Sequence, residues 1–185
     1  MKNSSILNNC NIKTPRFFLR NLRPEDASEH YLRWMNCDIA RKYIVASKQR
    51  QTISSLRHFI TEKDNQDNCL FLGIFLLQNN KHIGNIKYEP INFDLSQAFM
   101  GVLIGDNNWR GKAVFQEVLL YSSIWLKKHF GIKEILLGVE KSNISAIKAY
   151  TKAGFEVADT KNDNKTGRDA IEMSLVIKPN ISNMR

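Results

Sequence analysis

A short stretch rich in basic and small residues, Asp106–Val114, has the residue types of an anion-binding loop. It follows an apolar run, Phe99–Ile104, that predicts a strand, and it precedes a segment with the apolar periodicity of a helix. Unpaired N–H groups and the positive dipole end at a helix N-terminus favour phosphate. Gly111 and Ala113 are small enough for a ligand to approach the backbone. The stretch predicts an anion cradle; the alternative is an ordinary strand–loop–helix joint with solvated cations.

A second stretch, Val139–Phe155, brings a carboxamide and a phenol onto one helical face. Asn143 and Tyr150 are seven residues apart, and Ala146 lies between them on the same face at helical spacing. Both polar side chains are therefore expected to project together beside the end of a core strand. The alternative is that Asn143 only caps the helix and Tyr150 only packs against it.

Composition restricts the class of protein. The chain has 185 residues, of which 43% are hydrophobic and 24% charged, which suits one globular domain. A formal charge of +9 favours an acidic ligand, but no arginine-rich arm or basic-aromatic pattern points to nucleic acid. Three scattered cysteines predict free thiols in a reducing compartment, and the histidines lack metal-ligand spacing, so no metal is expected. Without a signal-peptide or membrane-spanning pattern, we expect a cytoplasmic protein with no membrane partner.

The chain reads as one mixed α/β domain over residues 16–178, with a loose lead-in at 1–15 and a polar tail at 179–185. Apolar runs predict strands, and capping and periodicity predict helices. The expected strands are Arg16–Arg20, Cys69–Leu77, Lys81–Tyr88, 98–104, Glu134–Val139, Phe155–Val157 and Ala170–Ile177. Helices are expected from Arg23–Pro24, around Ile39–Tyr43, over 52–64, from Val114 and over 144–152; Pro90–Ser96 is expected to be a loop and Lys161–Arg168 a polar turn.

With both stretches present in this order, the chain resembles the GNAT superfamily of acyl-CoA N-acyltransferases. Asn108–Trp109–Arg110 followed by Gly111-x-Ala113 is similar to that family's pyrophosphate loop, and the stretch from Asn143 to Phe155 is similar to its second motif. Asn108 stands where the family usually has Gln or Arg, and Ala113 replaces the commoner second glycine. Alanine is an accepted variant that still allows close backbone approach, provided that its φ is negative. The resemblance implies a GNAT-like mixed sheet of about seven mostly antiparallel strands, splayed in the middle, with about four helices.

The resemblance also implies acetyl-CoA as co-substrate and a direct attack of an amine on the thioester. The residues that it implies for binding acetyl-CoA are Val102, Leu103, Ile104, Arg110, Gly111, Lys112, Ala113, Val114, Asn143, Ala146 and Lys152. Tyr150 is the candidate general acid for the departing thiolate, and Glu89 is the candidate base. His30, Asp94 and a chain of waters are rivals for the role of base.

The acceptor is less sharply indicated. Leu19–Asp26 and Tyr31–Asn36 resemble the branch with ribosomal-protein alanine acetyltransferases, whereas Ile83–Tyr88 and Ile104–Asp106 are similar to relatives that acetylate nucleotide-linked amino sugars. A small-molecule amine, such as a nucleotide-linked amino sugar, is favoured over a protein N-terminus. A non-catalytic acyl-CoA-binding module is the alternative from another class. A homodimer formed through the last strand and the tail is left open.

Overall fold

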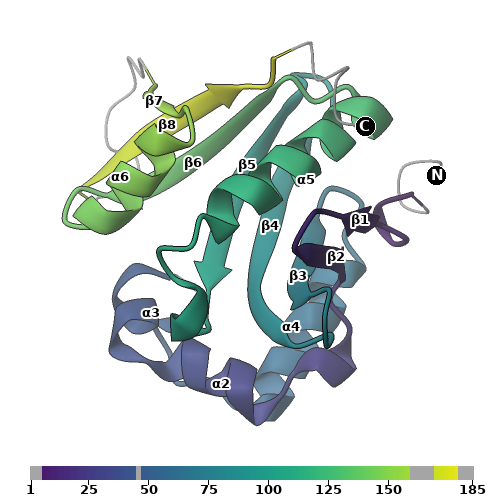
Figure 1. The fold of residues 1–185 in the computed structure, drawn as a ribbon, viewed down its shortest axis with the longest axis vertical. Helices are drawn as coiled ribbons and strands as arrows, with labels where there is room; N and C mark the ends of the chain where they lie inside the picture. The colour runs from purple at the N-terminus through teal and green to yellow at the C-terminus, as the bar shows by residue number, and fades with distance from the viewer. Residues whose placement is uncertain (1–5, 45–46, 159–168, 179–185) are drawn as a thin grey trace.

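The computed structural model describes residues 6–44, 47–158 and 169–178. Its elements are β1 (Asn11–Lys13), β2 (Phe17–Asn21), η1 (Pro24–Asp26), α2 (Glu29–Asn36), α3 (Asp38–Tyr43), α4 (Ile53–Asp64), β3 (Leu70–Leu76), β4 (His82–Asn92), β5 (Gln97–Ile104), η3 (Asn107–Trp109), α5 (Val114–Phe130), β6 (Glu134–Glu140), α6 (Ile144–Lys152), β7 (Glu156–Val157) and β8 (Ala170–Val176). They form one eight-stranded sheet in the order β1-β2-β3-β4-β5-β6-β8-β7 (Figure 1). The expected mixed α/β fold with a mostly antiparallel sheet is confirmed.

The sheet splays between β5 and β6, its one parallel pair in the described part of the chain. These strands pair only where Gln97–Phe99 faces Glu134–Leu136, and beyond that point they diverge (Figure 1). The rest of β5, as far as Ile104, has no described strand beside it on this edge. Backbone N–H and C=O groups are strong hydrogen-bonding groups, so this free edge can bind an extended ligand as an added strand.

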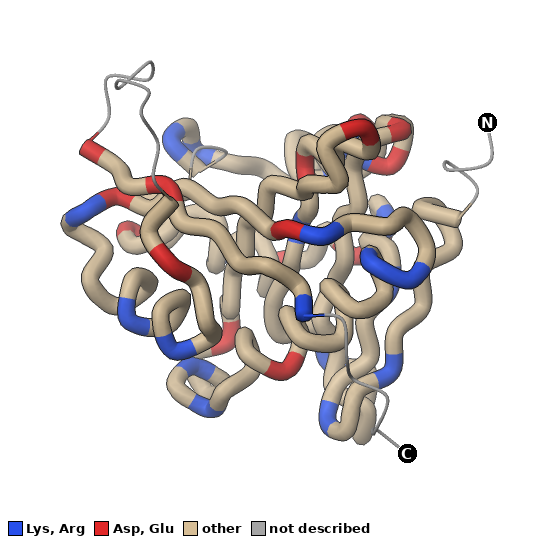
Figure 2. Tube along the Cα trace, turned by 90° about the horizontal axis from the view of Figure 1, so that it is seen from above, with Lys and Arg blue, Asp and Glu red and all other residues tan. Residues whose placement is uncertain are grey.

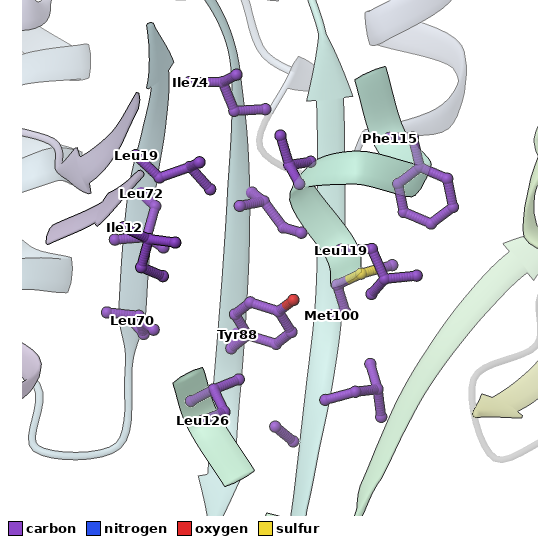
Figure 3. Packing of buried hydrophobic residues seen from close by; sticks show 14 of the residues in the cluster. Ile12, Leu19, Leu70, Leu72, Ile74, Tyr88, Met100, Phe115, Leu119 and Leu126 are labelled. Atoms are coloured by element: carbon purple, nitrogen blue, oxygen red, sulfur yellow. The ribbon is translucent and has the colours of Figure 1, made fainter. Parts of the chain in front are cut away.

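The two faces of the sheet carry separate cores. Helices α5 and α6 cover one face, and α2 and α4 cover the other. Figure 3 shows Phe115, Leu119 and Leu126 of α5 lying over Tyr88 and Met100 of the sheet. The Tyr88 hydroxyl of β4 also lies 2.7 Å from Ser122 Oγ, which fixes α5 on the sheet.

The N-terminal lead-in predicted for residues 1–15 is wrong for the part that the structure describes. Strand β1 pairs antiparallel with β2, and Leu7, Cys10 and Ile12 are buried in the main core. The Asn21 side chain accepts from the Cys10 N–H and donates to the Leu7 carbonyl, so it holds this segment from both sides. Apolar side chains scattered among asparagines are enough to order the segment once the rest of the core is present.

Two predicted boundaries also differ from the structure. The residues after Arg23 form only a 3-10 turn, and α2 begins at Glu29, where the Ser28 hydroxyl caps the Tyr31 N–H. Strand β4 continues through Pro90 to Asn92 past an irregularity in its pairing with β5, so the predicted loop is shorter. The turn predicted at Lys161–Arg168 and the tail at 179–185 lie outside the described residues.

Charge is distributed over the whole molecule. Figure 2 shows Lys and Arg positions on many elements and on several sides of the described chain, interspersed with Asp and Glu. Within the described ranges, no helix has the length and apolar character needed to cross a membrane. The same part of the chain contains no group of three or more His, Cys, Asp or Glu side chains placed to hold a metal.

Candidate active site

Both sequence motifs line a single cleft of about 730 Å³, a volume typical of small-molecule sites. The free edge of β5 contributes one wall, the loop before α5 a second, and the start of α6 a third. The lining includes Val102, Ile104, Trp109, Arg110, Gly111, Ala113, Val114, Asn143, Ala146, Tyr150 and Lys152. The splay and the two motifs therefore meet in one place, as their resemblance to the family implies.

The loop before α5 has a backbone suited to an anion. Gly111 has φ +71° and Ala113 has φ +55°, so both lie in the left-handed region. Lys112 between them does not have a positive φ. Such a turn can direct successive N–H groups toward one side as a concave nest, and here it leads into the N-terminus of a 17-residue helix. The expectation of a negative φ at Ala113 is wrong, because Ala113 is the N-cap residue that carries the turn into α5.

The strand end that leads into this loop is held in place from outside the cleft. Asp106 is buried, its Oδ1 accepts from the Asn108 N–H at 2.9 Å, and its Oδ2 lies 2.8 Å from Lys81 Nζ. The Trp34 ring lies against Gly105 so closely that a Cβ there would come within 2.0 Å of it. The end of β5 is thus fixed to the hairpin and to α2, and the loop starts from a rigid point.

Arg110 and Lys112 occupy different positions around the loop. Arg110 lines the cleft, and its Nε donates to the Ile104 carbonyl at 3.0 Å, so that carbonyl is already in use. The Lys112 ammonium lies over the Trp109 ring, 5.4 Å from its centroid, and Lys112 does not line the cleft. Leu103 also does not line the cleft, because it packs against the core under α2 and α4.

Asn143 both caps α6 and lines the cleft. Its Oδ1 accepts from the Ala146 N–H at 3.3 Å, which is an N-cap interaction. Its amide nitrogen donates to no residue in the described ranges and is available to a ligand. The two interpretations of Asn143 are therefore compatible: the oxygen orders the helix while the nitrogen stays free.

Tyr150 lies deeper in the same cleft, between aromatic rings. Its ring is edge-on to Phe115 at 5.3 Å between centroids and 5.8 Å from Phe155. Burial raises the pKa of Tyr150 to about 12, because the phenolate is poorly solvated there. The hydroxyl consequently keeps its proton at neutral pH, as a general acid must.

Helix α3 closes one side of the cleft, a contribution that was not predicted from the sequence. Ile39 and Tyr43 line it, and the Tyr43 hydroxyl donates to the Ser142 carbonyl at 3.4 Å. Ile39 and Ile144 are both more than half exposed despite being apolar. Their exposure suits contact with a ligand, but only the folded arrangement of α3 and α6 brings them to the same cleft.

Glu89 is separate from Tyr150 and does not line the cleft. It follows Tyr88, which pairs with Met100 at the start of the splay, and it contacts Lys63 of α4 at 2.7 Å and Lys87. Burial acts to raise the pKa of Glu89, but the two ammonium groups outweigh it and the pKa is lowered. Glu89 is therefore ionised at neutral pH but is a weak base.

The two other candidate bases lie in different places. The His30 ring packs edge-on against Trp34 at 4.8 Å, and its Nδ1 lies 3.2 Å from an Arg33 nitrogen. Asp94 lies in the turn between β4 and β5, at the end of β5 opposite the loop that leads to α5. Neither residue lines the cleft.

The sequence profile described as "Acetyltransferase (GNAT) domain" matches residues 16–156, most of the chain. The chain therefore belongs to the GNAT acetyltransferase family and is an acetyl-CoA-dependent N-acetyltransferase. No curated protein sequence matches it significantly.

Solved structures with the same fold come from enzymes with different acceptors. RimL, a ribosomal L7/L12 α-N-protein acetyltransferase in complex with coenzyme A, has a TM-score of 0.77 at 13% identity, over 91% of this chain and 98% of that chain. The microcin C7 self-immunity acetyltransferase MccE, with acetyl-CoA and AMP, has 0.74 at 20% identity, over 88% and 93%. Spermidine N-acetyltransferase from Vibrio cholerae, with CoA and spermine, has 0.71 at 16% identity, over 86% and 95%. At these identities the likeness concerns the fold.

Proposed function

We propose that this enzyme acetylates a small-molecule primary amine, such as a nucleotide-linked amino sugar, and binds acetyl-CoA in the cleft between β5 and α6. The observation that carries the proposal is the meeting of a free strand edge, a left-handed anion nest and a protonated tyrosine in one cleft. Each part matches one portion of acetyl-CoA: the pantetheine arm, the pyrophosphate and the thiol end. The bound thioester supplies the acetyl group.

The roles of the chain's own residues follow from this fit. The backbone groups of Val102 on the free edge of β5 and the amide nitrogen of Asn143 bind the pantetheine arm. The N–H groups from Gly111 to Val114 bind the pyrophosphate, and Arg110 adds positive charge. Tyr150 gives its phenolic proton to the thiolate that leaves when the amine attacks. No nucleophile from the protein is needed, in agreement with cysteines that lie outside the cleft lining.

The acceptor ammonium must lose a proton before it attacks, and we propose that Glu89 receives it through water. Glu89 lies next to the strand position where the splay starts, and it is ionised. Glu89 does not line the cleft, so a water relay carries the proton without direct contact between Glu89 and the acceptor.

A protein N-terminus is the second candidate acceptor. RimL, whose structure is similar over nearly the whole chain, acts on a ribosomal protein, whereas MccE and the spermidine enzyme hold small molecules. The preference for a small molecule rests on the resemblance of the Ile83–Tyr88 and Ile104–Asp106 segments to amino-sugar enzymes.

The test is thiol release from acetyl-CoA against a panel of nucleotide-linked amino sugars, polyamines, amino acids and peptides with free N-termini. Release that requires a nucleotide-linked amino sugar is expected. Release with peptides alone would replace the proposal by the protein acceptor. Binding of CoA by calorimetry without release on any amine would favour an acyl-CoA-binding module.

A further inference from the structure

Arg16 lies outside the cleft, just before β2, but its guanidinium reaches the loop that lines the cleft. Nη1 donates to the Lys112 carbonyl at 2.9 Å, and Nη2 donates to the Ala113 carbonyl at 3.4 Å. Nε donates to Glu117 Oε2 at 2.6 Å. One side chain from the N-terminal segment thus joins two loop carbonyls to the first turn of α5.

These contacts fix the direction of the N–H groups on the other side of the loop, together with the Glu117 N–H, which donates to the Ala113 carbonyl at 3.3 Å. A trans peptide holds its C=O and the next N–H antiparallel, and both peptides here are trans. With the Lys112 and Ala113 carbonyls turned toward Arg16, the N–H groups of Ala113 and Val114 point away from it. Ala113 and Val114 line the cleft, whereas Arg16 does not. Arg16 therefore acts on the cleft through the backbone.

The same guanidinium offsets a negative charge at an unfavourable place. Glu117 lies in the first turn of α5, where a carboxylate competes with a bound anion for the helix N-terminus. Glu117 Oε1 also accepts from Thr14 Oγ1 at 2.6 Å and from the Arg16 N–H at 3.0 Å. The carboxylate is fully engaged on the side of the N-terminal segment and is drawn away from the loop.

The position of Arg16 is itself well fixed. Its guanidinium lies over the Phe17 ring at 4.8 Å, and the Phe17 ring is edge-on to Trp109 at 5.5 Å. Trp109 is part of the cleft lining. Phe17 thus supports both the guanidinium and the start of the loop.

We propose that Arg16 is a positioning residue for coenzyme A: its guanidinium holds the carbonyls of Lys112 and Ala113 so that the following N–H groups face the pyrophosphate. The inference rests on the assignment of this loop as the pyrophosphate site in the proposed function. Arginine suits the role because its planar fork serves two carbonyls and a carboxylate together, while the single ammonium of lysine serves fewer partners.

The test is calorimetric titration of Arg16→Met and Arg16→Lys with CoA, with dephospho-CoA, and with S-acetylpantetheine, which lacks the pyrophosphate. Arg16→Met is expected to weaken CoA and dephospho-CoA by about tenfold alike and to leave S-acetylpantetheine within about twofold. Arg16→Lys keeps the charge and is expected to stay within about threefold of Arg16→Met. Equal weakening of S-acetylpantetheine, or wild-type CoA affinity in either variant, would overturn the proposal.

Two further variants distinguish the role of Arg16 from the general loss of an ion pair and from the assignment of the loop as the pyrophosphate site. Arg20→Met breaks a comparable pair with Asp26, 2.7 and 2.8 Å long, away from the loop, and is expected to keep CoA affinity within twofold of wild type. Gly111→Val places a branched side chain at φ +71° and is expected to abolish CoA binding in a folded protein. Normal CoA binding by Gly111→Val would remove the loop assignment itself. If CoA affinity is lost in Gly111→Val but kept in Arg16→Met, then the loop assignment stands and only the role of Arg16 is excluded.

Discussion

The Tyr150 ring lies edge-on to the Phe115 ring, with centroids 5.3 Å apart and ring planes 74° apart. Phe115 is in the first turn after the anion-binding loop, and Tyr150 is in the second motif, so this contact joins the two. Burial raises the pKa of Tyr150 to about 12.

Tyr150→Phe should therefore keep the packing and lose the acid. We expect kcat to fall about a hundredfold at saturating acetyl-CoA, within the usual contribution of a general acid. The measurement is kcat with the acceptor identified by the panel, with the dissociation constant for CoA measured in parallel. A variant with wild-type kcat would exclude Tyr150 as the acid.

Lys63 provides a test of Glu89 by pH. Removing its ammonium with Lys63→Met takes away a stabilising partner of the carboxylate, so the pKa of Glu89 should rise. A base works only when deprotonated, and the acidic limb of the profile of kcat/KM against pH should consequently move to higher pH. Glu89→Gln should remove this limb and lower kcat/KM at neutral pH by about a hundredfold. An acidic limb that keeps its position in Lys63→Met argues that another group titrates.

Local sequence signals were sufficient to predict the two motifs that line the cleft. The pairing of an apolar strand with a basic, small-residue turn at Gly111, and the spacing of Asn143 and Tyr150, each depend on residues near one another in the chain. The structure joins them in a cleft because the splay sets their distance. The same reasoning predicts the hairpin of β3 and β4 from its apolar runs and a tight turn at Asn79–Asn80, and the structure confirms it, with Asn80 at φ +56°.

Long-range contacts explain what the sequence did not predict. From the sequence, Glu89 is expected to be a free loop carboxylate. In the structure, α4 places Lys63 beside it, although the two residues are 26 positions apart in the chain. Arg16 reads as the start of a strand, and its contact with Glu117 spans 101 residues. The positive φ of Ala113 is equally hidden, because alanine has no local preference for the left-handed region.

Replacing Ala113 by glycine should stabilise the fold. The left-handed backbone at this position destabilises the fold by about 1–2 kcal/mol with alanine but not with glycine. Glycine also raises the entropy of the unfolded chain, which lowers the free energy of unfolding by about 0.4–1 kcal/mol. We expect Ala113→Gly to raise the free energy of unfolding by up to about 1 kcal/mol, measured by urea denaturation. Ala153→Gly is the matched control: Ala153 has φ −83°, so that variant should be destabilised. A loss of stability in both variants would contradict the argument from backbone strain.

Gly111 should show the opposite effect. A Cβ added there meets nothing within 4 Å, so only the backbone at φ +71° opposes a side chain. Gly111→Ala should lower the free energy of unfolding by up to about 1 kcal/mol, once the gain from the stiffer unfolded chain is subtracted from the cost of the left-handed backbone. Circular dichroism would establish that the fold persists, and urea denaturation would measure the change. An unchanged free energy would show that the loop relaxes to a negative φ.

His82 is a buried group that should make stability depend on pH. Its Nε2 lies 2.9 Å from the Gly84 carbonyl and 2.8 Å from Asn85 Oδ1, and its ring stacks on Phe75 at 4.9 Å. Two oxygen acceptors require a proton on Nε2, so the neutral ring already satisfies them. Burial lowers the pKa of His82, and the hydrogen bond with Asn85 and the charge of Asp26 offset this only in part.

Because the pKa of His82 is lower in the folded state, the unfolded chain takes up the proton first as pH falls. The contribution of His82 is therefore complete above its ordinary pKa of 6.5 and is lost below it, by at most about 1.4 kcal/mol per pH unit. Urea denaturation at pH 7.5, 6.5 and 5.5 should show this loss in the wild type and a smaller loss in His82→Gln, which cannot titrate. The exposed His129 supplies the control, since His129→Gln should keep the wild-type slope. If His82→Gln also keeps that slope, then the acid sensitivity arises elsewhere and the pKa of His82 is the same in the folded and unfolded states.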